Sequence, residues 1–302
     1  MILMGIKIEK PSIYLGKSKV NILKFAPKYK NAIKEKIGSK YIHLENKKNI
    51  FEMSLEACRK INLNSKKINF LIFVSQGQDK ILPSCAEQIA QKLNLNKNAF
   101  VFTISSGCSG FVQALFLASE LLNQKNKNGL IVCAEKYSKY IPRQNTKIKV
   151  LFSDAASATL VKYDSRKNIL GSDFGYDGNN YNALQTFNFK NKNILSMDGN
   201  RIYLFGINSI PKSIKNVLKN KKIKIDYYLL HNGSKFLIDS LADKVSNSKK
   251  KLLTSFNVTG NTVSSSIPLL INIHYKKLKS KNIIMSGFGV GLSWATILMK
   301  WI

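Results

Sequence analysis

Short apolar runs alternate with longer amphipathic stretches along most of the chain. The runs are rich in β-branched and aromatic residues, which predicts buried strands, and apolar residues spaced three or four apart predict helices. The predicted strands cover residues 68–74, 99–104, 129–134, 158–163, 226–230, 251–254, 282–285 and 293–298. The predicted helices cover 83–93, 109–123, 202–218, 263–278 and a stretch from about 234, and Pro83 is expected to begin the first.

The order of these elements predicts the fold class. Strands that alternate with helices indicate an α/β protein with a largely parallel sheet and helices outside it. The order found in residues 1–165 is repeated in residues 166–302, and no Pro/Gly/Ser-rich linker separates them. We therefore expect two similar halves that arose by internal duplication.

Composition narrows the class of protein further. Of the 302 residues, 44% are apolar and 22% charged, which is typical of a globular chain. No apolar run reaches the roughly 18 residues that a membrane-spanning helix needs, and the first residues lack the layout of a signal peptide. We expect a cytoplasmic protein that does not bind membranes. Its four cysteines are too few for a disulfide framework.

The formal net charge of +31 has two interpretations. Lysine, asparagine and isoleucine are abundant throughout, which the codon bias of an AT-rich genome would produce. Alternatively, the positive surface attracts an acidic partner. Nucleic acid is not the expected partner, because arginine is scarce and no basic stripe with interleaved aromatics occurs. Three histidines and four scattered cysteines form no metal motif, and no nucleotide-binding glycine loop is present, so we expect neither cofactor.

Cys108 stands where a predicted strand is followed by a predicted helix. It lies in Ser105-Ser-Gly-Cys-Ser-Gly110, whose glycines allow a tight turn and the close approach of a substrate. The helix dipole and the unpaired amides at a helix N-terminus stabilise a thiolate. Cys108 is therefore predicted to be a nucleophile, whereas Cys58, Cys85 and Cys133 are interpreted as buried structural residues.

Two further polar residues occupy comparable junctions. His231 follows the predicted strand 226–230, and parallel sheets present functional groups just beyond the carboxyl ends of their strands. Asn261 lies in Thr259-Gly-Asn-Thr262, before the next predicted helix. Considered separately, His231 is also compatible with a structural role in a turn, and Asn261 with a role as a helix cap. Together with Cys108 they predict a Cys-His-Asn active site.

The order and spacing of the motifs resemble those of the β-ketoacyl-acyl-carrier-protein synthase III family of the thiolase superfamily. The resemblance covers almost the whole chain and rests on Gly107-Cys-Ser-Gly110, Phe152-Ser-Asp-Ala-Ala-Ser-Ala158, Met197-Asp-Gly199, His231-Asn-Gly233, Gly260-Asn-Thr262 with Ser266-Ile-Pro268, and Gly287-Phe-Gly-Val-Gly-Leu-Ser-Trp294. It implies a thiolase-like, duplicated five-layer αβαβα fold, with the nucleophile in the first half and the histidine and asparagine in the second.

The resemblance also implies a decarboxylative Claisen condensation in fatty acid or specialised acyl-chain biosynthesis. Cys108 takes the acyl group from a thioester, and malonyl-acyl carrier protein then binds. His231 and Asn261 stabilise the enolate that forms as carbon dioxide leaves, and the carbanion attacks the acyl-cysteine. The backbone amides of Cys108 and Val290 form a second oxyanion hole; the family usually has glycine where Val290 stands.

Other implied features concern partners. The family resemblance predicts a homodimer in which Leu82 gates the acyl pocket of the partner. Lys235, near the start of the helix after His231, is the candidate for docking the acidic carrier protein, because it is expected to project beside the entrance.

The primer substrate stays open at this point. The best-studied members of the family stack the adenine of coenzyme A between a tryptophan and an arginine, and the aligned positions here are Ala32 and Thr146. Lys36 is the candidate for a phosphate contact. The primer therefore arrives either as acyl-coenzyme A or as an acyl group on the carrier protein.

Three alternative functions remain. A papain-like cysteine hydrolase uses Cys, His and Asn in the same chain order, but places its cysteine near the mature N-terminus. A non-condensing acyltransferase of the same fold would pass the acyl group from Cys108 to an alcohol or amine. A non-catalytic scaffold that binds the carrier protein would not need an intact triad.

Overall fold

Two mixed sheets form the framework of the protein, whose computed structural model describes residues 5–80, 82–142, 144–246 and 248–302. The larger sheet has the strand order β1-β8-β7-β5-β6, and β2 also pairs with β8. Its strands are β1 (Ile6–Ile8), β2 (Ser12–Leu15), β5 (Phe70–Val74), β6 (Phe100–Ile104), β7 (Asn128–Glu135) and β8 (Ala155–Tyr163). Strand β5 is parallel to β6 and β7, whereas β8 is antiparallel to β7.

The second sheet has the order β12-β13-β14-β9. Its strands are β9 (Ile169–Tyr176), β12 (Tyr227–Leu230), β13 (Asn282–Gly289) and β14 (Ser293–Lys300). Only the pair β12–β13 is parallel, so the expectation of a largely parallel sheet is wrong. The reason is the connection: a short turn joins β13 to β14, and parallel neighbours need a crossover of about a dozen residues or more.

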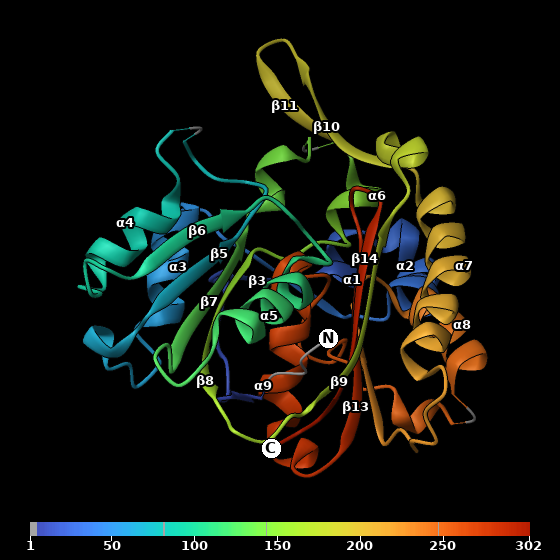
Figure 1. Ribbon diagram of the computed structural model, residues 1–302. Coiled ribbons are helices and arrows are strands. Elements are labelled where there is room, and N and C mark those ends of the chain that lie inside the picture. Colours follow the sequence, from blue (N-terminus) through green and yellow to red (C-terminus); the bar gives the residue numbers. More distant parts are fainter. Residues whose placement is uncertain (1–4, 81, 143, 247) are drawn as a thin grey trace.

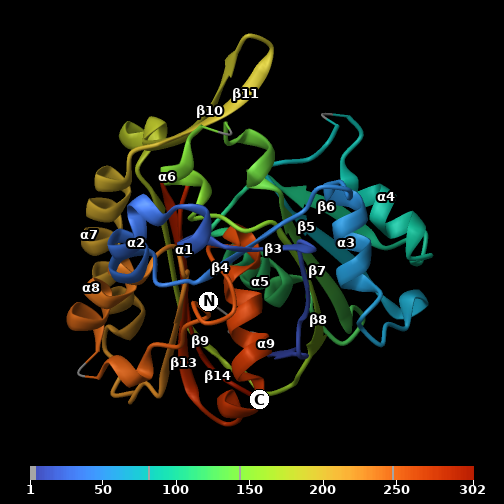
Figure 2. The ribbon, with the colours of Figure 1, turned by 180° about the vertical axis from the view of Figure 1, so that it is seen from behind.

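Helices cover both sheets and fill the space between them (Figures 1 and 2). The helices of these layers are α3 (Ile50–Cys58) and α4 (Cys85–Lys92) outside the larger sheet, α5 (Gly110–Leu121) and α9 (Ser266–Leu278) between the sheets, and α7 (Gly199–Leu218) and α8 (Lys235–Val245) outside the second sheet. Alternate residues of a strand point to opposite faces. Leu71 and Phe73 of β5 therefore pack with α3 and α4, and Ile72 and Val74 with α5 and α9. The predicted five-layer thiolase-like fold is confirmed.

Several elements were not predicted from the hydrophobic pattern. They are β1, β2, α3 and β9, with the bounds given above, and β3 (Ser18–Asn21), α1 (Ile22–Phe25), α2 (Lys30–Ala32), β4 (Tyr41–Leu44), α6 (Thr146–Lys149), β10 (Leu184–Phe189) and β11 (Lys192–Met197). Strands β10 and β11 form a hairpin that projects from the body of the protein (Figure 1). Half of the side chains on its two strands are exposed and only two are buried, so its sequence lacks the buried apolar run by which other strands were recognised.

Two predicted elements are corrected. Residues 251–254 do not form a strand, since Leu252 makes only an isolated bridge to Tyr228. Helix α4 begins at Cys85 rather than at Pro83, because the Ser84 hydroxyl caps it by accepting a hydrogen bond from the Ala86 amide. The division expected near residue 165 falls between β8 and β9, which belong to different sheets; the duplication itself stays a prediction.

Candidate active site

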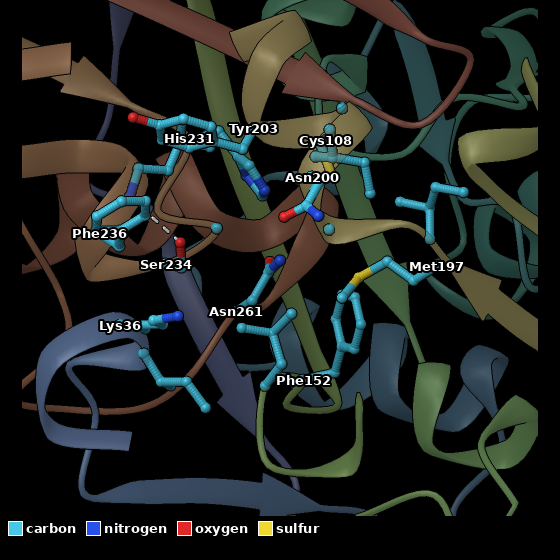
Figure 3. A pocket seen from close by; sticks show the side chains of 18 of the residues that line it. Lys36, Cys108, Phe152, Met197, Asn200, Tyr203, His231, Ser234, Phe236 and Asn261 are labelled. Atoms are coloured by element: carbon cyan, nitrogen blue, oxygen red, sulfur yellow. Dashed lines mark hydrogen bonds between the residues drawn. The ribbon is translucent and has the colours of Figure 1, made fainter. Parts of the chain in front are cut away.

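The three residues of the predicted triad line one cavity of about 550 Å³, here called the nucleophile cavity. Cys108 lies between β6 and α5, His231 directly follows β12, and Asn261 lies shortly before α9. Figure 3 shows their side chains directed into the same space from these three segments. The fold thus brings together three residues that are far apart in the sequence.

Two glycines of β13 allow this strand to pass close to the nucleophile. A Cβ atom at Gly287 would lie 2.5 Å from the Cys108 carbonyl oxygen, and one at Gly289 would lie 2.8 Å from Cys108 Sγ. Gly289 also has a φ of +154°, a backbone conformation that side chains rarely adopt. Glycine at both positions therefore allows close packing of β13 against Cys108, which places the backbone amide of Val290 within hydrogen-bond distance of the sulfur.

The electrostatic setting of Cys108 differs from the one predicted. Burial raises the pKa of its thiol to about 12, while hydrogen bonds from the backbone amides of Val290 and of Cys108 itself act in the opposite direction. Removal from water outweighs these hydrogen bonds, so the thiol is the favoured form at neutral pH. The same two amides are the ones predicted to form an oxyanion hole, and both lie within reach of Sγ.

His231 is a neutral imidazole at the wall of the cavity. Burial lowers its pKa to about 3, and its ring stands edge-on to Phe288 with 5.9 Å between centroids. Among the described residues, nothing hydrogen bonds with its buried Nδ1 atom. A neutral imidazole carries one N–H, and the ring nitrogen nearer to Gly233 is Nε2. In the tautomer with its proton on Nε2, His231 donates a hydrogen bond into the cavity without carrying a charge.

The side-chain amide of Asn261 is oriented by its neighbours. Its Oδ1 atom accepts a hydrogen bond of 2.8 Å from the amide of Val263, a β-branched residue held at a φ of +52°. Its backbone is fixed to Leu151 and Ser153 by bonds of 2.9 and 2.8 Å. Such a conformation at Val263 costs on the order of 1–3 kcal/mol and is typical of functional sites. With Oδ1 engaged, Nδ2 remains the donor.

The two donors face a common point. A carbon built as the Cβ of Gly233 would lie 3.5 Å from His231 Nε2 and 3.9 Å from Asn261 Nδ2. The two nitrogens therefore border the same part of the cavity, and a substrate oxygen held between them, clear of Gly233, would accept from both as in an oxyanion hole. The space exists because residue 233 has no side chain.

The open end of the nucleophile cavity is lined by positive and aromatic side chains. Lys36 and Lys147 line it together with Tyr203 and Phe236, whose rings stack at 5.0 Å and 25° (Figure 3). Sequence reasoning selected Lys36 but missed Lys147 and the aromatic pair. Lys147, Tyr203 and Phe236 are far from Lys36 in the sequence, and no sequence pattern indicated that the four side chains line the same cavity.

Two other predicted residues lie outside this cavity. Lys235 does not line it; its ammonium group pairs with Asp239, and its side chain packs against Gly38. Leu82 is 83% exposed in the single chain and lines no wall of the cavity. Ala32, aligned with the family's tryptophan, is exposed and offers no aromatic face.

The sequence reasoning also missed Glu135, a fully buried carboxyl group at the end of β7. Its Oε1 accepts a bond of 3.0 Å from the Gln76 amide, and its Oε2 lacks a hydrogen-bond partner among the described residues. Burial raises its pKa to about 8. The position of Glu135 directly after a long apolar run was the feature of the sequence that could have indicated a buried carboxyl group.

This carboxyl group predicts a pH-dependent effect on stability. The folded protein holds the Glu135 proton between the ordinary pKa of 4.5 and about 8, so the free energy of unfolding falls as pH rises through that window. Glu135→Gln should unfold with a free energy higher than that of the unmodified protein by about 4 kcal/mol at pH 8 and by less than about 1 kcal/mol at pH 4.5. Urea titrations at both pH values measure it. An equal difference at both values would contradict the assignment.

Among the residues that the structure describes, no group of three or more His, Cys, Asp or Glu side chains is placed to hold a metal ion. Within the same ranges, no helix has the length and apolar character needed to cross a membrane.

Comparison with known proteins decides the family. The model of 3-oxoacyl-[acyl-carrier-protein] synthase III matches residues 102–178, and the model of its C-terminal part matches residues 216–301. A β-ketoacyl-[acyl-carrier-protein] synthase III of Streptococcus mutans is 30% identical over 269 residues, which is 82% of each chain. The chain belongs to the β-ketoacyl-acyl-carrier-protein synthase III family. The family that the sequence motifs resemble is thereby confirmed.

Other relatives agree over nearly the full length. The synthase III of Streptococcus uberis is 29% identical over 291 residues, 89% of this chain and 90% of that protein. The solved 3-oxoacyl-(acyl-carrier protein) synthase of Burkholderia xenovorans LB400 superposes with a TM-score of 0.90 at 25% identity, covering 99% of this chain and 95% of that chain. That of Aquifex aeolicus VF5 gives 0.88 at 26%, covering 98% and 100%. The protein is an acyltransferase-type enzyme of this family, and the papain-like hydrolase is excluded.

Proposed function

We propose that this protein is a 3-oxoacyl-acyl-carrier-protein synthase III that condenses an acyl thioester with malonyl-acyl carrier protein. The observation that carries the proposal is the common cavity: the Cys108 thiol, the His231 Nε2 donor and the Asn261 Nδ2 donor all face it. Family membership supports the same reaction. Fatty acid or specialised acyl-chain biosynthesis in the cytoplasm is the setting that we infer.

The first half-reaction transfers the acyl group to Cys108. The sulfur attacks the thioester carbonyl, and the amides of Cys108 and Val290 donate hydrogen bonds to the oxygen that becomes negative. The carbon–sulfur bond to the carrier then breaks. The proton that leaves the Cys108 thiol ends on the departing thiol, so the step needs no external acid or base in its balance.

The second half-reaction uses the other pair of donors. The thioester carbonyl of the malonyl group accepts hydrogen bonds from His231 and Asn261, which stabilise the enolate as carbon dioxide is released. Because burial lowers its pKa to about 3, His231 acts here as a neutral imidazole whose Nε2–H donates to the carbonyl oxygen. The enolate carbon attacks the acyl-cysteine and expels the thiolate of Cys108, giving the 3-oxoacyl thioester. The thiolate then takes up one proton from water, which restores the thiol.

We infer that acyl carrier protein approaches the open end of the nucleophile cavity. The net charge of +31 attracts an acidic partner, and Lys36 and Lys147 line the opening where a phosphate of the pantetheine arm would pass. Docking at Lys235 stays a prediction, and its contact with Asp239 would have to open. Coenzyme A and carrier protein both remain possible carriers of the primer.

We also propose a homodimer. Strand β6 is an edge of the larger sheet within the described chain, and Leu82 and Phe100 are 83% and 57% exposed. An unpaired edge beside exposed apolar side chains favours pairing with a second copy. Light scattering at micromolar concentration should give twice the mass of 34.0 kDa. A monomer at that concentration would contradict both the dimer and the role of Leu82 as a gate.

Product analysis tests the proposed function. The purified protein is incubated with malonyl-acyl carrier protein and acyl donors on coenzyme A or on carrier protein, and the products are read by mass spectrometry. The expected product is a 3-oxoacyl-carrier protein that is two carbons longer than the donor acyl group, with release of carbon dioxide. Transfer of the acyl group to an alcohol or amine without loss of carbon dioxide would instead identify a non-condensing acyltransferase.

A further inference from the structure

Glu135, the buried carboxyl group that the proposed mechanism does not use, lies at the same sheet edge as the nucleophile. Strand β5 is parallel to β6 and β7 and lies between them, so the carboxyl ends of the three strands are neighbours. Glu135 ends β7, Gln76 comes shortly after β5, and Cys108 comes shortly after β6. The order of the strands therefore places Gln76 between the carboxyl group and the nucleophile.

Gln76 contacts the surroundings of both groups. Its backbone amide donates a hydrogen bond of 3.0 Å to Glu135 Oε1. Its side-chain oxygen lies 2.5 Å from where a Cβ atom of Gly107 would stand, so it packs directly on the residue before the nucleophile. The same oxygen accepts a bond of 3.1 Å from the hydroxyl of Tyr137, which belongs to the buried cluster of Cys108. One residue thus bridges the carboxyl group and the turn that carries the nucleophile.

Within the described ranges, few groups stabilise a charge on Glu135. Its Oε2 atom has no hydrogen-bond partner there, and neither has the buried hydroxyl of Ser264, which faces the carboxyl group. Lys139 is a cation that favours the carboxylate, but its ammonium group donates a bond of 2.6 Å to the Gly77 carbonyl and lies 3.7 Å from Asp79 Oδ1. A carboxylate at this position is therefore poorly compensated.

The charge of Glu135 acts on titratable side chains from several elements. Those that face it within the described ranges, besides Lys139, are Cys108, Cys133, Tyr137 and Tyr140. Burial raises the pKa of Cys108, Cys133 and Tyr137, and a negative charge on Glu135 raises it further, because like charges repel strongly in a dry interior. Of these three groups, Cys108 is the one that lines the nucleophile cavity.

A charge on this carboxyl group therefore opposes the formation of the attacking thiolate. We propose that Glu135 controls the reactivity of Cys108 through its own proton: the protonated carboxyl group leaves the thiolate free to form, and the ionised group suppresses it. Glu135 is thus a positioning residue, which acts through the nucleophile and not on the substrate. The proposal rests on the proposed function, because it takes Cys108 as the reacting group.

This coupling predicts the shape of a pH profile. The carboxyl group keeps its proton at neutral pH, because burial raises its pKa to about 8. Below that pH, the thiolate fraction of Cys108 grows about tenfold per pH unit, as for an isolated thiol. Above it, the charge that appears on Glu135 raises the pKa of the thiol and offsets part of this gain. The rate at which Cys108 reacts should therefore fall below the extrapolated line.

The test measures alkylation of Cys108 by iodoacetamide between pH 6 and pH 10, with mass spectrometry of the peptide that contains residue 108. The rate reports the thiolate fraction, because the thiolate is the reacting form. Glu135→Gln should react at the rate of the unmodified protein at pH 6 and about three- to tenfold faster at pH 9.5, since one unit of pKa changes the thiolate fraction tenfold. A ratio that is the same at both pH values would overturn the proposal.

Asp154→Asn is the matched control. Asp154 is also a buried carboxyl group whose pKa is raised by burial, but its oxygens accept hydrogen bonds from Ser138 and from the Glu45 amide. The ratio of its alkylation rate to that of the unmodified protein should stay constant, within about twofold, from pH 6 to pH 9.5. A rise as large as in Glu135→Gln would show that the effect does not come from the charge beside Cys108.

The unmodified protein alone provides a second measurement. Its logarithmic rate should bend near pH 8, and a straight line of unit slope up to pH 10 would overturn the proposal even if the variants do not fold. Acylation by an acetyl-pantetheine thioester separates the outcomes. If no thioester acylates Cys108, the proposed function fails, while the alkylation profile still tests Glu135. If acylation occurs but the profile is straight, the role of Glu135 fails and the proposed function stands.

Discussion

Cys108→Ala should abolish covalent acylation of the protein by acyl thioesters. The sulfur is the atom that accepts the acyl group, and no other group in the nucleophile cavity replaces it. Mass spectrometry of the intact protein should show the added acyl group in the unmodified protein and none in the variant. Peptide mapping should place the group on the peptide that contains residue 108.

Cys58→Ala is the control for this result. Burial raises the pKa of the thiols of Cys58 and Cys108 alike to about 12, so ionisation alone does not distinguish them. Cys58 is packed in the apolar cluster beside the larger sheet, whereas Cys108 lines a cavity with amides directed at its sulfur. Cys58→Ala should therefore be acylated normally. Acylation that persists in Cys108→Ala at another cysteine would exclude Cys108 as the nucleophile.

Asn261→Ala should slow the release of carbon dioxide from malonyl-acyl carrier protein by about 10²–10³-fold, while the acyl-Cys108 still forms. The Nδ2 donor acts on the malonyl carbonyl, not on the acyl donor that reacts first. Release of labelled carbon dioxide measures the second step, and the mass of the acylated protein measures the first. His231→Ala should separate the two steps in the same way.

Asn261→Asp distinguishes donation from structure. The aspartate retains an oxygen that accepts from the Val263 amide, so the local backbone keeps its hydrogen bond, but the Nδ2 donor is lost. This variant should lose decarboxylation as severely as Asn261→Ala. Normal carbon dioxide release from the alanine variants at both 231 and 261 would reject the assignment of this oxyanion hole.

The helix terminus and burial act in opposite directions on the nucleophile. Position 108, just before α5, predicted a stabilised thiolate, but burial raises the pKa of the thiol to about 12. The sequence did not show this burial, because strand β13, which packs against Cys108 at Gly287 and Gly289, is distant in the chain. A protonated resting thiol also implies that its proton leaves as the acyl group arrives.

The hydrophobic pattern predicted the central strands of the larger sheet, β12, β13 and β14 of the second sheet and most of the helices that cover them, but not β1, β2, β9 or α3. The motifs indicated the five-layer fold and the three triad residues that line one cavity. Each of these depends on local periodicity or on a residue placed at a strand-to-helix junction, so the information lies within a short stretch of chain. The antiparallel run of β14, the missing strand at 251–254 and the exposed β10–β11 hairpin escaped prediction. They depend on how connections turn and on which neighbour supplies hydrogen bonds.

Tertiary structure alone decided the properties of the cavity. The contact of the buried Glu135 with Gln76 and the stack of Tyr203 on Phe236 each join residues from different elements. Such contacts follow from the packing of layers rather than from any local sequence pattern. Burial, which sets both the pKa values and the shape of the acyl site, exists only once the two sheets have closed around α5 and α9.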